Sequence, residues 1–208
     1  GSCQQGYGAT APDIFPVMAE VSLSFFLQLG GWTYPVFGKP GKGYNESMDK
    51  LEETYRYRYD YNYPFNSSVL SRMPVAYLYD DHDFAGNDAD GANPFKLNSV
   101  KAYSMFFPHY KLGNQENGIW QKFRFGDVEF FLLDLRTQRS ANGNALDSAG
   151  RFDPPSGHSI LKGYTINGEN QKTWLENSLK NSDAKWKVIV STVIFNPRYS
   201  DALKDERI

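Results

Sequence analysis

The sequence predicts a layered α/β protein, in which β-strands are flanked by helices. Five segments that are apolar, β-branched and aromatic have the length of buried strands. Helical patterns with apolar residues at spacings of three and four lie between several of them. Ligands collect at the carboxyl ends of the strands in open α/β sheets, so the residues that follow each strand are the first candidates for chemistry. The predicted strands are 23–29, 75–79, 119–125, 128–134 and 186–195.

Length and composition fit one domain with a substantial core. The chain has 208 residues, of which 40% are apolar and 16% aromatic, and single domains run to roughly 250 residues. A net charge of −2 argues against a nucleic-acid partner bound through bulk charge. No apolar run reaches the roughly 20 residues of a membrane span, and no charged leader followed by an apolar segment marks a signal peptide. The single cysteine, Cys3, excludes an internal disulfide framework.

The first predicted strand is followed by residues suited to ligand binding. It ends at Gly30-Gly31, a pair that allows a tight turn and a close approach of the backbone to a ligand. Tyr34 follows, either as a core aromatic residue or as a phenolate ligand. A short helical turn is expected at 14–20, and a longer helix at 47–59 has acidic residues early and arginines late, as the helix dipole favours.

The second predicted strand ends in Asp80, Asp81, His82 and Asp83. Three carboxylates around one imidazole would repel each other unless a cation lay among them. Hard cations take oxygen ligands, and an imidazole beside them can serve as a ligand or a proton donor. Asn87, in the polar stretch that follows, could complete the shell of such a cation with its amide oxygen. A solvated acidic loop after a core strand is the alternative, and the short motif leaves both interpretations open.

The second half of the chain adds a helix, a hairpin and a basic strand end. The helix is predicted over 94–107, with Pro94 at its start. The hairpin joins the next two strands, and its second strand leads to Arg136 and Arg139. Such arginines can clamp a phosphate bidentately, and they can equally pair with nearby carboxylates. A further helix with an asparagine cap is predicted over 167–181.

Five motifs follow one another along nearly the whole chain: GSC, LQLG-x-W-T-Y, DDHD-F-x-x-N, FRFGDVEFFLLDLRTQR and EN-Q-x-x-WL-x-x-SL-x-x-S-x-A-x-WKV. In this order they resemble the alkaline phosphatase D family of metallophosphatases. The resemblance implies a metallophosphatase sandwich, two mixed β-sheets flanked by helices. It also implies a secreted or periplasmic hydrolase that cleaves phosphomonoesters and phosphodiesters with ferric iron and calcium. Oxygen ligands alone would also suit magnesium or manganese.

The same resemblance implies roles for single residues. Cys3 resembles the thiolate ligand of the iron and Tyr34 its phenolate ligand. Asp81 resembles the next metal ligand and Asn87 a calcium ligand. His82 resembles the neighbouring group that assists the leaving oxygen.

The DxRxxR stretch of the family matches Arg136 and Arg139, which implies that both face the substrate phosphate and that Arg136 takes part in catalysis.

The sequence also departs from the family pattern at two places. Gly31 occupies the place of a carboxylate, within Gly-Asp-x-x-Tyr, that is expected to bridge the metals. Nothing after Phe195 supplies the later Gly-Asp-x-His motif.

The sequence therefore predicts that residues 1–208 are an incomplete metallophosphatase catalytic domain, whose carboxyl-terminal part is missing. We expect metal-dependent hydrolysis of a small phosphoester, impaired by Gly31 and by the missing motif. The rival hypothesis is a catalytically inactive relative that binds a phosphate ligand or calcium. Gly31 favours this rival. The enzyme, or a recent loss of its activity, is favoured by the retained site residues, which are Cys3, Tyr34, Asp81, His82 and Asn87.

Overall fold

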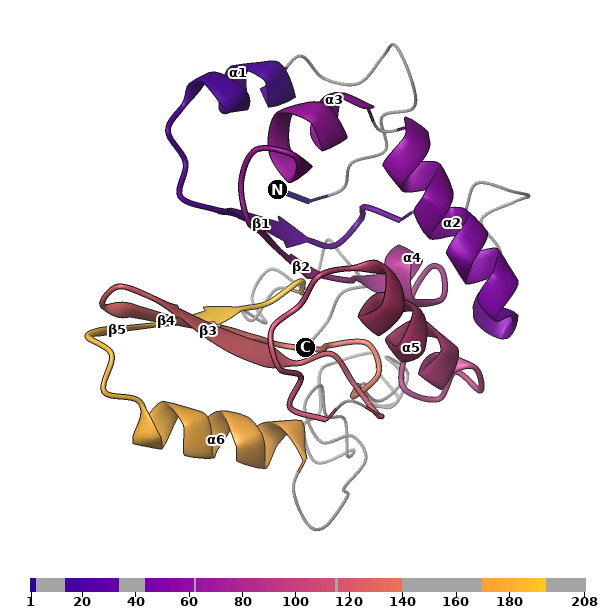
Figure 1. The fold of residues 1–208 in the computed structure, drawn as a ribbon. Coiled ribbons are helices and arrows are strands. Elements are labelled where there is room, and N and C mark those ends of the chain that lie inside the picture. Colours follow the sequence, from indigo (N-terminus) through magenta and orange to yellow (C-terminus); the bar gives the residue numbers. More distant parts are fainter. Residues whose placement is uncertain (3–13, 34–43, 62, 115, 140–169, 194–208) are drawn as a thin grey trace, which may run out of the picture.

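The computed structural model describes residues 1–2, 14–33, 44–61, 63–114, 116–139 and 170–193. In this part of the chain, helices lie between most of the strands, as expected for a layered α/β protein (Figure 1). The elements run α1 (Ile14–Glu20), β1 (Phe26–Leu29), η2 (Tyr44–Glu46), α2 (Met48–Tyr61), α3 (Tyr63–Phe65), η3 (Asn66–Leu70), β2 (Val75–Leu78), α4 (Asp81–Phe84), α5 (Lys96–Phe106), β3 (Gln121–Phe125), β4 (Val128–Leu132), α6 (Gln171–Asn181) and β5 (Trp186–Val190).

The described strands form two sheets. β1 and β2 pair in parallel, and their last residues, Leu29 and Leu78, lie opposite each other. Parallel strands need a long crossover, which here carries α2 and α3. In the second sheet β4 lies between β3, its antiparallel partner, and β5, its parallel partner. Figure 1 shows α1, α2 and α3 beyond the first sheet and α6 beyond the second, so the sheets lie between layers of helices.

The main core packs around Trp32, which follows β1 and is completely buried. Its ring meets Tyr55 of α2, Tyr77 of β2 and Phe107 edge-on, with ring centroids 6.0, 5.5 and 5.3 Å apart. Edge-to-face aromatic pairs at such distances are favourable, by about 0.5–1.5 kcal/mol beyond their burial. This packing fixes the backbone at the carboxyl end of β1, where the candidate site begins.

The predicted strands and helices are present, with boundaries that differ at their ends. The strand expected over 23–29 begins only at Phe26, whose N–H donates to the carbonyl of Pro74 at 2.9 Å, where pairing with β2 starts. The strand expected over 186–195 ends at Val190. An apolar run shows where a strand can form, but the length of its partner decides where pairing stops. No helix among the described residues is long and apolar enough to cross a membrane.

The cap of α6 and the structure of the acidic motif differ from expectation. The helix predicted over 167–181 begins at Gln171, and its cap is Asn170, whose Oδ1 accepts a hydrogen bond from the N–H of Thr173 at 2.9 Å. The acidic motif after β2 forms the short helix α4 (Asp81–Phe84) and not a loop.

Candidate functional site

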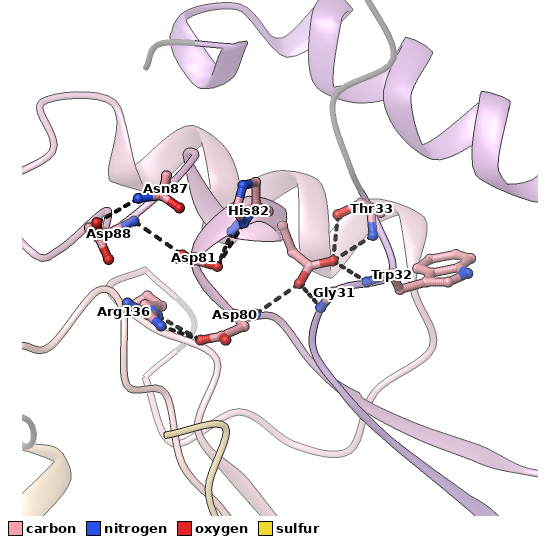
Figure 2. A network of polar contacts seen from close by, with 10 residues as sticks. Gly31, Trp32, Thr33, Asp80, Asp81, His82, Asn87, Asp88 and Arg136 are labelled. Atoms are coloured by element: carbon pink, nitrogen blue, oxygen red, sulfur yellow. Dashed lines mark hydrogen bonds and ion pairs between the residues drawn. The ribbon is translucent and has the colours of Figure 1, made fainter. Parts of the chain in front are cut away.

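The candidate site lies where β1 and β2 end. Because the two strands are parallel and in register up to Leu29 and Leu78, the residues that follow them emerge at the same edge of the sheet. Figure 2 shows the turn of Gly31, Trp32 and Thr33 beside the start of α4. Two of the predicted motifs are therefore brought together.

A capping box starts α4 immediately after β2. Asp80 is the cap, with an extended backbone, and its side chain accepts a hydrogen bond from the N–H of Asp83. In return the Asp83 carboxylate accepts the N–H of Asp80 at 2.9 Å. An Asp at the cap and another acidic residue three positions later are a sequence signal for a helix start. This signal was present in the motif and could have predicted the helix.

Asp83 also binds the turn after β1. Its Oδ2 accepts the N–H of Gly31 at 2.5 Å, and its Oδ1 accepts the N–H groups of Trp32 at 2.8 Å and Thr33 at 2.5 Å. The Thr33 hydroxyl donates to the same Oδ1 at 2.9 Å. Asp83 is only 3% exposed, so these bonds compensate a buried charge.

The carboxylate of Asp80 pairs with Arg136, which follows strand β4 of the second sheet. Its Oδ1 lies 2.7 Å from both Nε and Nη2 of Arg136, whose side chain is completely buried. Burial raises the pKa of Asp80, although the Arg136 guanidinium acts in the opposite direction. The sequence left open whether Arg136 pairs with a carboxylate or faces a phosphate, and the described contact is with a carboxylate. Protein donors thus satisfy Asp80 and Asp83, which corrects the expectation that these charges require a cation.

Asp81 and His82 form a pair on the first turn of α4. Asp81 Oδ1 lies 3.0 Å from His82 Nδ1 and accepts the backbone N–H of His82 at 2.7 Å. Its Oδ2 accepts the N–H of Asp88 at 3.1 Å. Burial acts to raise the pKa of Asp81, but the charge of Arg136 and these hydrogen bonds outweigh it and lower the pKa. Asp81 is therefore the carboxylate held in the anionic form that a metal ligand requires.

Asn87 lies at the exposed edge of the same region. Its side-chain Nδ2 donates to Asp88 Oδ2 at 2.5 Å, and Figure 2 shows both residues beside Asp81. The predicted trio of Asp81, His82 and Asn87 is thus gathered by α4 and the turn after it.

The turn that carries Arg136 is organised by a buried aspartate that the sequence analysis did not single out. Asp134 is completely buried, and its Oδ1 accepts the N–H groups of Arg136 at 3.1 Å and Thr137 at 3.0 Å. Its Oδ2 accepts the hydroxyl of Tyr79 and the N–H of Ile119, both at 2.9 Å. Asp134 therefore sets the backbone direction from which the Arg136 side chain reaches Asp80.

Helix α6 supports this turn through Gln171. The Oε1 of Gln171 accepts the N–H of Asp134 at 2.7 Å, and its Nε2 donates to the carbonyl of Asp134 at 2.7 Å. Gln171 is completely buried. No local pattern predicts this contact, because the two residues are 37 positions apart.

Arg139 lies near Arg136 at the end of the same turn. It is 3% exposed, and burial together with the charge of Arg136 lowers its pKa to about 10, against the opposite effect of Asp80, Asp90 and Asp88. Arg139 thus remains protonated at neutral pH. The two arginines add buried positive charge beside the carboxylates of α4.

The ligand chemistry of the described residues suits a hard cation but is not a complete ligand set. Asp81 supplies an ionised carboxylate and Asn87 an amide oxygen, which are ligand types that such cations accept, and His82 adds an imidazole beside them. No cluster of three or more His, Cys, Asp or Glu suited to a metal occurs within the part of the chain that the structure describes. Cys3 and Tyr34, the other predicted ligands, lie outside the described residues.

Comparison with known proteins identifies the family. The family model of PhoD-like phosphatases matches residues 1–207. The chain belongs to the PhoD-like phosphatase family. It is 26% identical over 220 residues to alkaline phosphatase D of Bacillus subtilis (strain 168), an alignment that covers 93% of this chain and 36% of the relative.

The solved structure titled "Structure of PhoD" is similar in fold to this PhoD-like chain. The TM-score is 0.62 at 20% identity, over 91% of this chain and 39% of the solved one. The predicted family and the layered α/β fold are therefore confirmed. The chain spans less than two fifths of the length of these two proteins.

Proposed function

We propose that this PhoD-like chain carries part of the active site of a metal-dependent phosphoesterase. The observation that supports this most directly is the pairing of an ionised Asp81 with His82 at a sheet edge, close enough to Arg136 for its charge to lower the pKa of Asp81. Phosphomonoesters and phosphodiesters of small molecules are the proposed substrates. A secreted or periplasmic location belongs to the same proposal and rests on the family alone.

The proposed metal ligands are Cys3 and Tyr34 for a ferric iron, Asp81 for the neighbouring metal position, and Asn87 for calcium. Bound metals of this kind lower the pKa of a water molecule and neutralise charge on a phosphoryl group. The contribution of the chain itself is to keep Asp81 ionised through Arg136 and through the N–H groups of His82 and Asp88.

His82 is proposed as the group that protonates the leaving oxygen. Asp81 Oδ1, 3.0 Å from Nδ1, orients the imidazole and favours a proton at that nitrogen. A histidine held in this way can act as a general acid through its other ring nitrogen. Positioned general acids typically contribute about 10²–10⁴-fold to a rate.

Arg136 and Arg139 are proposed to act on the substrate phosphate through their charge. Arg136 is already paired with Asp80 at 2.7 Å, so it supplies positive potential from a fixed position. Arg139 lies in the same turn and adds a second guanidinium. The proposed contribution of both is attraction and charge neutralisation, with Asp80 holding Arg136 in place.

A second candidate function is supported by Gly31. This residue has a positive φ of 65° and no side chain, so position 31 supplies no carboxylate where the family resemblance implies a metal ligand. We propose that this lowers the rate of hydrolysis. In the extreme case the protein would bind calcium or a phosphate ligand without turnover.

Hydrolysis of bis-p-nitrophenyl phosphate with added Fe³⁺ and Ca²⁺ tests the proposal. We expect weak hydrolysis by the protein, and a further loss of about 100-fold or more in His82→Ala. Asp60→Asn, on the exposed end of α2, is the control and should retain the activity. Binding of Ca²⁺ by calorimetry without any hydrolysis would instead support the non-catalytic candidate.

A further inference from the structure

Asp83 accepts more hydrogen bonds than the capping of a helix requires. The capping box uses one bond, from the N–H of Asp80. Four further bonds reach it from Gly31, Trp32 and Thr33, residues 50 to 52 positions away in the sequence. A carboxylate has about four lone-pair sites, so the oxygens of Asp83 are fully used by the protein.

The turn that supplies these donors has the form of an anion-binding nest. Gly30 and Gly31 have positive φ values of 70° and 65°, and the N–H groups of Gly31, Trp32 and Thr33 converge on one carboxylate. Such concave runs of N–H groups bind anions. Here the anion is a side chain of the same protein, so the nest serves to join two segments.

We propose that Asp83 is a positioning residue that fixes helix α4 to the turn after β1 and thereby holds Asp81 and His82 in place at the edge of the first sheet. The strand pairing ends at Leu29 and Leu78, so the ladder of β1 and β2 does not hold the residues beyond it. Asp83 is separated by one residue from Asp81 and directly follows His82 in the sequence. Its four hydrogen bonds from that turn thus hold the start of α4, which carries Asp81 and His82, against the end of β1.

The close approach of the two segments supports this role independently. A Cβ atom added to Gly30 would lie 2.3 Å from the Cβ and 2.8 Å from the backbone nitrogen of Asp80. The turn therefore rests directly on the start of α4, and the Asp83 bonds keep it there. The inference rests on the proposed function, in which Asp81 is a metal ligand.

Thr33 offers a test that leaves the buried carboxylate in place. Thr33→Val removes the hydroxyl that donates to Asp83 Oδ1, whereas Thr33→Ser retains it. In the metal-free protein we expect the amides of residues 31–33 to exchange at least ten-fold faster in Thr33→Val, with the amides of β3 and β4 unchanged. Ca²⁺ affinity, measured by calorimetry, should fall at least five-fold in Thr33→Val and return in Thr33→Ser.

Asp83→Asn is the larger perturbation, because the NH₂ group of the new side chain would face N–H donors. The folding of this variant should be checked by circular dichroism. Wild-type affinity for Ca²⁺ in Thr33→Val, together with faster amide exchange, would overturn the proposal and leave Asp83 only its role in the capping box of α4. Ca²⁺ binding that responds to Thr33→Val without any hydrolysis would support the positioning role while the phosphoesterase proposal fails. A protein that neither binds Ca²⁺ nor hydrolyses the ester would overturn both.

Discussion

At the scale of single residues, the acidic motif divides into separate roles that its sequence does not distinguish. Asp80 pairs with Arg136, Asp83 binds the turn after β1, and Asp81 orients His82. Burial acts to raise the pKa of Asp81, but the charge of Arg136 and the hydrogen bonds it accepts lower it below its ordinary value. The motif therefore contains one proposed metal ligand between two residues that hold the backbone.

The lowered pKa of Asp81 predicts a pH-dependent contribution to stability. Its ionised form is favoured in the folded protein, so the contribution is present above the ordinary value of 3.8 and is lost as the pH falls through the lower folded value. Asp81→Asn should reduce the free energy of unfolding by about 1–2 kcal/mol at pH 7, as expected for lost charge-assisted bonds. Urea unfolding between pH 7 and pH 3 should show this difference shrinking, and a constant difference would contradict the assignment.

Gly30 predicts a steric effect that can be separated from backbone strain. Gly30→Ala would meet Asp80 and adopt a positive φ, whereas Gly126→Ala has a positive φ of 58° with nothing within 4 Å. We expect a loss of about 1–2 kcal/mol for Gly126→Ala, from the left-handed backbone alone. Gly30→Ala should cost about 2–4 kcal/mol, because overpacking adds to that strain. Equal losses in urea unfolding would show that the two segments are not in close contact.

At the scale of elements, α6 contributes a polar end to the site as well as an apolar face. Leu175 of α6 packs in the smaller core with Phe131 of β4 and with Leu133, which directly follows β4. Gln171 at its first position binds both backbone groups of Asp134. A helix on the outer layer thus supports the turn of Arg136.

Gln171→Ala should therefore destabilise the protein more than its position at a helix end suggests. It leaves the buried N–H and C=O of Asp134 without their partner, at a cost of about 2–4 kcal/mol in the free energy of unfolding. Asn177→Ala, on the exposed side of the same helix, is the control and should change it by less than about 0.5 kcal/mol. Amide exchange at Asp134 should also accelerate in Gln171→Ala, and an unchanged rate would argue against the contact.

At the scale of the whole molecule, polar contacts hold the two sheets together at the site. The main core contains residues from both sheets, among them Phe26, Tyr77 and Leu132. Apolar packing is not directional, so it brings the sheets together without fixing their relative position closely. Two polar contacts fix that position, because each buried polar group must meet its own partner. They are the hydrogen bond from the Tyr79 hydroxyl to Asp134 and the pairing of Asp80 with Arg136.

The sequence by itself determined the α/β class, the family and the places where polar residues follow strands. Those features depend on local periodicity, turn residues and motif order, which are properties of neighbouring residues. Only the tertiary structure decided that Asp83 faces Gly31, 52 positions away, and that Arg136 faces Asp80, 56 positions away. The physical reason is that strand pairing and sheet packing choose which distant donors meet each buried carboxylate, and no local pattern encodes that choice.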